Sequence, residues 1–136
     1  MPRSEISTGP AFLVHCRDAG GAEDQLRALA EEHWEYIDRF SDQLIARGPT
    51  TTADGEKHTG SIHVLTAPDL AAAQRFADEE PYRRAGAYAD VTVTRFENLL
   101  GRTMWDRPPP SRPAQSTFVL ATSGAASLAP ADLSAI

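Results

Sequence analysis

Two segments with helical periodicity, set among short segments of strand composition, constrain the fold of this chain more than any other feature. Apolar residues recur at helical spacing across the first of them without an interrupting glycine or proline. The predicted elements are, in chain order, a strand at 11–18, a helix at 22–47 ended by Gly48-Pro49, strands at 50–57 and 58–67 joined by an Asp54-Gly55 turn, a helix at 68–79 and a strand at 90–100.

This β-α-β-β-α-β order predicts a ferredoxin-like α+β fold, in which both helices cover one face of an antiparallel four-stranded sheet. We expect a flexible leader at residues 1–10 and one domain at residues 11–106. Three consecutive prolines then begin a Pro-rich extension at residues 107–136, since proline removes backbone donors and fixes φ. That extension is either a loose tail or an added strand at a sheet edge.

Composition excludes several classes of partner. The 136 residues carry a formal net charge of -6, whereas a nucleic-acid-binding protein gathers basic residues against phosphates. No run approaches the roughly 20 apolar residues that cross a bilayer. Cys16 is the one cysteine, which fits a reducing compartment. We therefore expect a cytoplasmic protein that binds neither nucleic acid nor membrane.

An ordered set of motifs resembles the YciI-like (YCII-related) family. The motifs are the helix that contains His33, the Gly48-Pro49 pair, Thr59-Gly60-Ser61, and residues 70–86 with Glu80-Pro81-Tyr82 and Ala85-Gly86. The resemblance implies a homodimer in which two four-stranded sheets face one another as a dimeric α+β barrel. A sheet with helices on only one face agrees with this, because a second copy can cover the other face.

The resemblance also implies a catalytic pair, since one branch of the family resembles a dehydrochlorinase that uses His and Asp without a cofactor. The corresponding residues here are His33 and Glu80, with Glu79 or Asp78 as alternatives if the turn is shifted. His33 lies in the apolar stripe of its helix, where an unpaired imidazole would cost about 1–3 kcal/mol. A carboxylate partner would fix its tautomer and leave the other nitrogen as a base. The alternative is a core histidine bonded to a backbone carbonyl.

A second polar group is predicted from strand periodicity. If the more apolar positions of the first and third strands lie under the helices, four polar residues face the other way and line a ligand pocket: His15, Arg17, Ser61 and His63. A hydrogen-bonded dimer seam explains them equally well. Trp34 and Tyr82 flank the expected site and could stack on an aromatic substrate, although ordinary packing would also account for them.

Metal and cofactor sites are not expected. The histidines, including His58, lack a local metal-binding spacing, and Cys16 is expected to be a buried, inert thiol. The leading hypothesis is a cofactor-independent enzyme of cyclic or aromatic metabolites, which performs elimination, isomerisation or cyclisation with His33 as base and Glu80 orienting it. The alternatives are a non-catalytic small-molecule-binding or interaction module and, by fold analogy, a cofactor-free monooxygenase.

Overall fold

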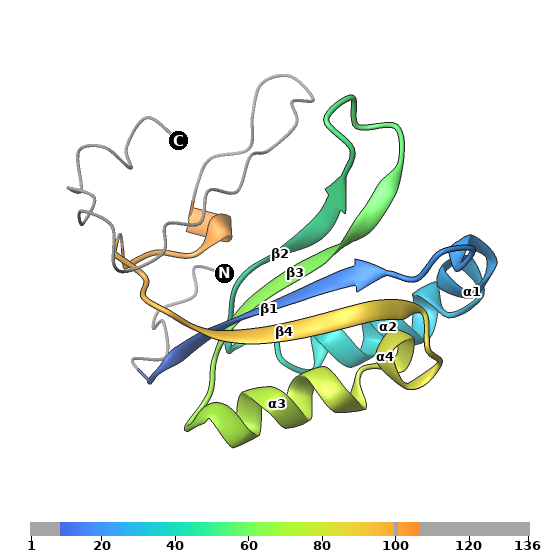
Figure 1. Cartoon of the computed structure of the whole chain (residues 1–136). Coiled ribbons are helices and arrows are strands. Elements are labelled where there is room, and N and C mark those ends of the chain that lie inside the picture. The colour runs from blue at the N-terminus through green and yellow to red at the C-terminus, as the bar shows by residue number, and fades with distance from the viewer. Residues whose placement is uncertain (1–8, 100, 107–136) are drawn as a thin grey trace.

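The computed structural model describes residues 9–99 and 101–106 (Figure 1). Its elements are β1 (Ala11–Asp18), α1 (Glu23–Ala28), α2 (Ala30–Asp38), β2 (Leu44–Thr51), β3 (His58–Thr66), α3 (Leu70–Glu79), α4 (Pro81–Arg84), β4 (Tyr88–Phe96) and the 3-10 turn η1 (Met104–Asp106). Most of the predicted leader and all of the predicted extension lie outside the described residues. Within the described part, no helix is long and apolar enough to cross a membrane.

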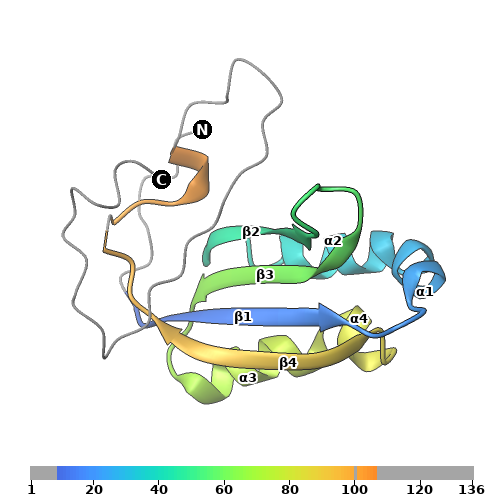
Figure 2. The same ribbon diagram turned by 45° about the horizontal axis from the view of Figure 1, so that its top comes forward.

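The four strands form one antiparallel sheet in the order β2-β3-β1-β4, and the helices lie together on one of its faces (Figures 1 and 2). This is the predicted ferredoxin-like α+β arrangement. β1, one of the two central strands, pairs with β3 on one side and β4 on the other. The helices α2, α3 and α4 therefore lie on the same face of the sheet.

The first predicted helix is too long. The helical residues end at Asp38, after a break at Leu29 between α1 and α2, and residues 44–47 begin β2 instead. Gly48-Pro49 therefore lies inside a strand rather than at a helix stop. β2 pairs only with β3, and a sheet edge tolerates a proline because one side of the strand makes no ladder bonds.

Apolar clusters occupy both faces of the sheet. The cluster on the helix side includes Val14, Leu65, Ile37 and Phe76, and holds most of the core. The cluster on the other side consists of Ala11, Leu13, Ile45 and Val64, with Ile62 and Phe96 packed against it. Val64 is fully buried in the single chain, so this face also contains buried apolar side chains, although fewer than the face under the helices.

The turns on either side of α3 are fixed by acidic caps. The side chain of Asp69 accepts a hydrogen bond from the amide of Ala72 at the start of α3. Glu80 is extended between α3 and α4, and its side chain caps α4, with Pro81 at the first helical position. This abrupt change of direction turns the Glu80 side chain toward α2.

The chain after β4 leads to the opposite edge of the sheet. There η1 lies beside β2, and the amide of Arg47 donates to Sδ of Met104 at 3.2 Å. Figure 2 shows η1 near β2, away from the β4 edge.

Candidate functional site

A buried histidine–carboxylate pair connects α2 with the turn between α3 and α4. Nδ1 of His33 is hydrogen-bonded to Oε1 of Glu80, and the two residues are 5% and 2% exposed. The other carboxylate oxygen, Oε2, accepts from the amide of Arg83 at 3.0 Å. Glu79 and Asp78, the alternative partners, are both exposed. Glu80 is thus the acid that His33 contacts, although the resemblance implies aspartate at this position.

Aromatic rings hold the imidazole in place. The ring of Tyr82 stacks on His33 with centroids 4.3 Å apart and an interplanar angle of 15°. The Tyr82 hydroxyl donates to the carbonyl oxygen of Leu26 at 2.8 Å, which ties α4 to α1. Trp34 meets the imidazole edge-on at 5.3 Å and is itself 46% exposed. The histidine is therefore fixed in orientation by its packing as well as by its carboxylate.

The predicted orientation of His63 and Ser61 is wrong. The β1–β3 register places Val14 opposite His63 and Cys16 opposite Ser61, so both polar residues lie under the helices with the main core. The residues of β3 were assigned to the wrong faces of the sheet because the face away from the helices is also apolar. Apolarity alone therefore does not identify the side that the helices cover.

His63 consequently belongs to the His33 site. The two imidazoles meet at 5.7 Å between centroids, and His63 also packs edge-on against Phe76. Burial, assisted by the charges of His33 and Arg47, lowers the pKa of His63 to about 3. Nδ1 of His63 has no hydrogen-bond partner among the described residues. A neutral second imidazole with a free nitrogen therefore lies beside the buried pair.

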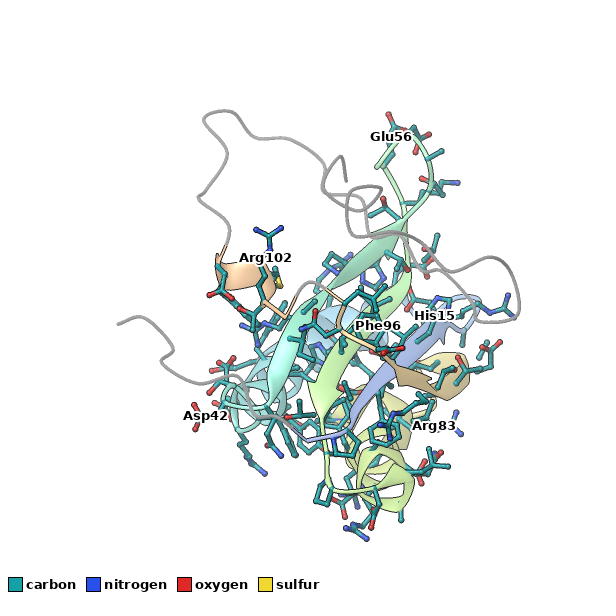
Figure 3. All side chains as sticks on the ribbon, turned by 90° about the vertical axis from the view of Figure 1, so that its left-hand side faces the viewer. His15, Asp42, Glu56, Arg83, Phe96 and Arg102 are labelled. Carbon is teal, nitrogen blue, oxygen red and sulfur yellow. The ribbon has the colours of Figure 1, made fainter. Side chains whose placement is uncertain are left out.

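His15 and Arg17 do lie on the face away from the helices, as predicted. His15 pairs with Ile62, and Figure 3 shows it on the side of β1 opposite to Arg83. The Arg17 guanidinium is exposed and bound to Asp90 through contacts of 2.8 and 2.6 Å. Neither contacts His33. Ser61 forms a hydrogen bond of 3.0 Å with the Tyr88 hydroxyl, so the four-residue pocket predicted from strand periodicity does not exist.

The sequence reading missed Arg47, because it placed this residue in a helix. The Arg47 guanidinium binds Oδ1 of Asp38 at 2.8 Å and lies over the Trp34 ring at 5.1 Å from its centroid. The Trp105 ring lies on it as well, at 6.0 Å. The sequence feature that could have placed Arg47 in a strand is the Gly48-Pro49 pair, because such a pair is compatible with an edge strand as well as with the end of a helix.

Neither of two hollows on the described part of the chain is lined by His33 or Glu80. The larger, of about 660 Å³, lies at the end of β1, and the smaller, of about 490 Å³, lies between α2 and the start of α4. The solvent-connected cavity expected beside the pair is therefore not among them. No group of three or more histidine, cysteine or acidic side chains in the described residues is arranged to hold a metal ion.

Comparison with known proteins places the whole α+β domain in one family. Residues 11–97 match the family model of the YCII-related domain. The chain is 27% identical over 95 residues to an uncharacterized protein of Haemophilus influenzae and 25% identical over 95 residues to protein YciI of Escherichia coli; each match covers 65% of this chain and 97% of the relative.

A solved structure shares the fold. It is 5-chloro-2-hydroxyhydroquinone dehydrochlorinase from Burkholderia phenoliruptrix AC1100, in complex with 2,5-dihydroxybenzoquinone. The TM-score is 0.61 at 23% identity, and the match covers 68% of this chain and 98% of that one.

Proposed function

This chain belongs to the YCII-related domain family, and we propose that it is a cofactor-independent enzyme that performs acid–base chemistry on a small hydroxylated ring compound. The observation that carries the proposal is the buried hydrogen bond between Nδ1 of His33 and Oε1 of Glu80. When the imidazole is neutral and donates from Nδ1–H to the Glu80 carboxylate, Nε2 carries the lone pair. A histidine oriented in this way is suited to act as a general base.

The environment supports one proton acceptor rather than two. His63, the other imidazole at the site, has a pKa of about 3, so it is uncharged at neutral pH and is a poor base. Its free nitrogen suits a hydrogen bond to a substrate oxygen instead. Trp34 presents an exposed aromatic surface beside His33, on which a ring substrate can stack.

The reaction class proposed first is loss of HCl from a chlorinated hydroxyhydroquinone, by analogy with the dehydrochlorinase that shares the fold. Two hydroxyl protons leave the substrate oxygens, one proton is added at the carbon that carries chlorine, and chloride departs with the bonding electrons. The products are a hydroxyquinone and HCl, so the balance needs no external oxidant or reductant. His33 would accept a hydroxyl proton and return one.

The test uses 5-chloro-2-hydroxyhydroquinone under anaerobic conditions, with chloride release as the readout. We expect turnover by the parent chain. In His33→Gln and Glu80→Gln, kcat should fall by at least about 100-fold, which is the scale of general acid–base catalysis. Glu79→Gln is the matched control, because Glu79 is an exposed neighbour with the same charge and should retain full activity.

A parent chain that releases no chloride above the buffer rate refutes the elimination reaction. The non-catalytic binding module is favoured instead if 2,5-dihydroxybenzoquinone binds, with His33-dependent affinity, and no turnover accompanies it.

A further inference from the structure

The larger hollow contains a second histidine–carboxylate pair that has no part in the proposed reaction. The hollow lies where the end of β1, the start of α1 and the turn end of the β2–β3 hairpin meet. Its volume is about 660 Å³, enough for a small organic molecule. The residues that matter for its chemistry are Asp18, Glu23, Leu26, Glu56, Lys57 and His58.

His58 and Asp18 are bonded to each other across the strands. Nδ1 of His58 lies 2.5 Å from Oδ2 of Asp18, and their side chains are 44% and 12% exposed. The ladder between β1 and β4 shifts register between Arg17 and Asp18, and a bulge of this kind re-aims the side chains beside it. Unlike His33, His58 thus combines a fixed carboxylate partner with access to a hollow.

The hairpin holds His58 in position. The amide of Thr52 donates to the carbonyl of Lys57 at 2.9 Å, and the amide of Lys57 donates to Oγ1 of Thr52 at 3.2 Å. Asp54 closes the turn by accepting from the amide of Glu56 at 3.0 Å. Although this hairpin stands out from the body of the molecule (Figure 3), its own hydrogen bonds order the residues that lead into His58.

The polar atoms around the hollow mostly accept hydrogen bonds. In a neutral His58 that donates from Nδ1, Nε2 is an acceptor, and Oδ1 of Asp18 is buried without a hydrogen bond in the described chain. Glu23 and Glu56 add two more carboxylates. The Arg17 guanidinium, which also borders the hollow, is already bound to Asp90. Lys57 is the lining cation that contacts no carboxylate within the described residues.

We propose that this hollow is a second ligand site, which takes a small primary amine in its ammonium form. An ammonium group has three donors and a positive charge, which match a wall of acceptors and excess negative charge. A carboxylate or phosphate ligand would be repelled, because its oxygens are negatively charged acceptors like those that line the hollow. Leu26, with Ala19 and Ala89, gives an apolar surface for the body of the ligand. The site is independent of the proposed reaction at His33.

Benzylamine is the probe, with benzyl alcohol and benzoate as matched ligands that change the charge. Titrations of the isotopically labelled full chain are followed by amide NMR shifts at Ala19, Thr59 and Ala89. We expect saturable shifts with benzylamine, with a Kd on the order of 1 mM for so small a ligand. Benzyl alcohol should bind about tenfold more weakly, and benzoate should produce no saturable shift.

Variants locate the site. Asp18→Asn and His58→Ala should each weaken benzylamine binding about tenfold. Glu56→Gln, on an exposed side chain that cannot unfold the domain, should weaken it about twofold. Glu31→Gln, an exposed acid on α2, and His33→Gln should leave the affinity unchanged.

Three outcomes would overturn the assignment. They are equal binding of benzylamine and benzoate, unchanged affinity in both Asp18→Asn and Glu56→Gln, and loss of binding in a His33→Gln chain whose amide spectrum shows that it is folded, which would place the probe at the other pair.

Discussion

The hydrogen bond between His33 and Glu80 should be measurable as a coupling free energy in a double-mutant cycle. His33→Phe keeps an aromatic ring against Tyr82 but removes the Nδ1 donor, whereas Glu80→Gln keeps an acceptor for the Arg83 amide but removes the charge. Each single variant leaves one buried group without its proper partner, which costs about 2–4 kcal/mol. The double variant leaves neither an unpartnered carboxylate nor an unpartnered imidazole, so its loss should be smaller than the sum of the two single losses.

A charge-assisted hydrogen bond at sites 5% and 2% exposed implies a coupling of about 1.5–3 kcal/mol. Urea unfolding of the four proteins at one pH measures it, provided the m-value stays constant. A loss of about 2 kcal/mol would also lower Tm by roughly 6 °C for a chain of this size. Glu79→Gln should change stability by less than about 0.5 kcal/mol, since Glu79 is exposed. A coupling below about 0.5 kcal/mol would refute a formed hydrogen bond in solution.

Three further results are expected. The free energy of unfolding should fall by about 2–3 kcal/mol between pH 6.5 and about pH 4.5 because of His63. Over this range the unfolded chain takes up a proton at His63, whereas the folded chain, with a pKa of about 3, does not. In urea titrations at several pH values, the His63→Gln variant should lack this part of the acid sensitivity of the parent. Iodoacetamide should alkylate Cys16 only after unfolding, because burial raises the pKa of its thiol to about 12, and mass spectrometry of the native protein showing rapid labelling would contradict this. Light scattering should give about twice the chain mass of 14.7 kDa, since a second copy is expected to cover the sheet face away from the helices; a clean monomer would rule out the homodimer that the family resemblance implies.

The sequence patterns were most informative where local chemistry decides the structure. The Asp54-Gly55 turn, the start of β1 and the helix before Pro81 follow from turn residues, strand composition and helical spacing. The contact between His33 and Glu80 could be predicted from the sequence for a related reason. A histidine inside an apolar stripe needs a partner, and the resemblance to the family indicated where an acid would come from.

The errors arose where tertiary context decides. Leu44 and Ile45 continue the helical spacing of α2, yet in β2 one packs under the helices and the other on the opposite face of the sheet. Because the sheet has two apolar faces, both side chains are buried in the strand. No local pattern distinguishes such a strand from the continuation of a helix. The phase of β3 failed for the same reason, which moved His63 from a predicted pocket to the side of His33.

The contact between η1 and β2 bears on how this domain tolerates shortening. The family match ends at residue 97, and Met104, whose sulfur accepts from the outer-edge amide of Arg47, lies just beyond it. A chain cut at the boundary of the match would keep all four strands but leave that amide without its partner at the outer edge of β2. An uncovered strand edge is a template for pairing with other chains. Shortened forms of this protein should therefore aggregate more readily in storage, although their folded core is complete.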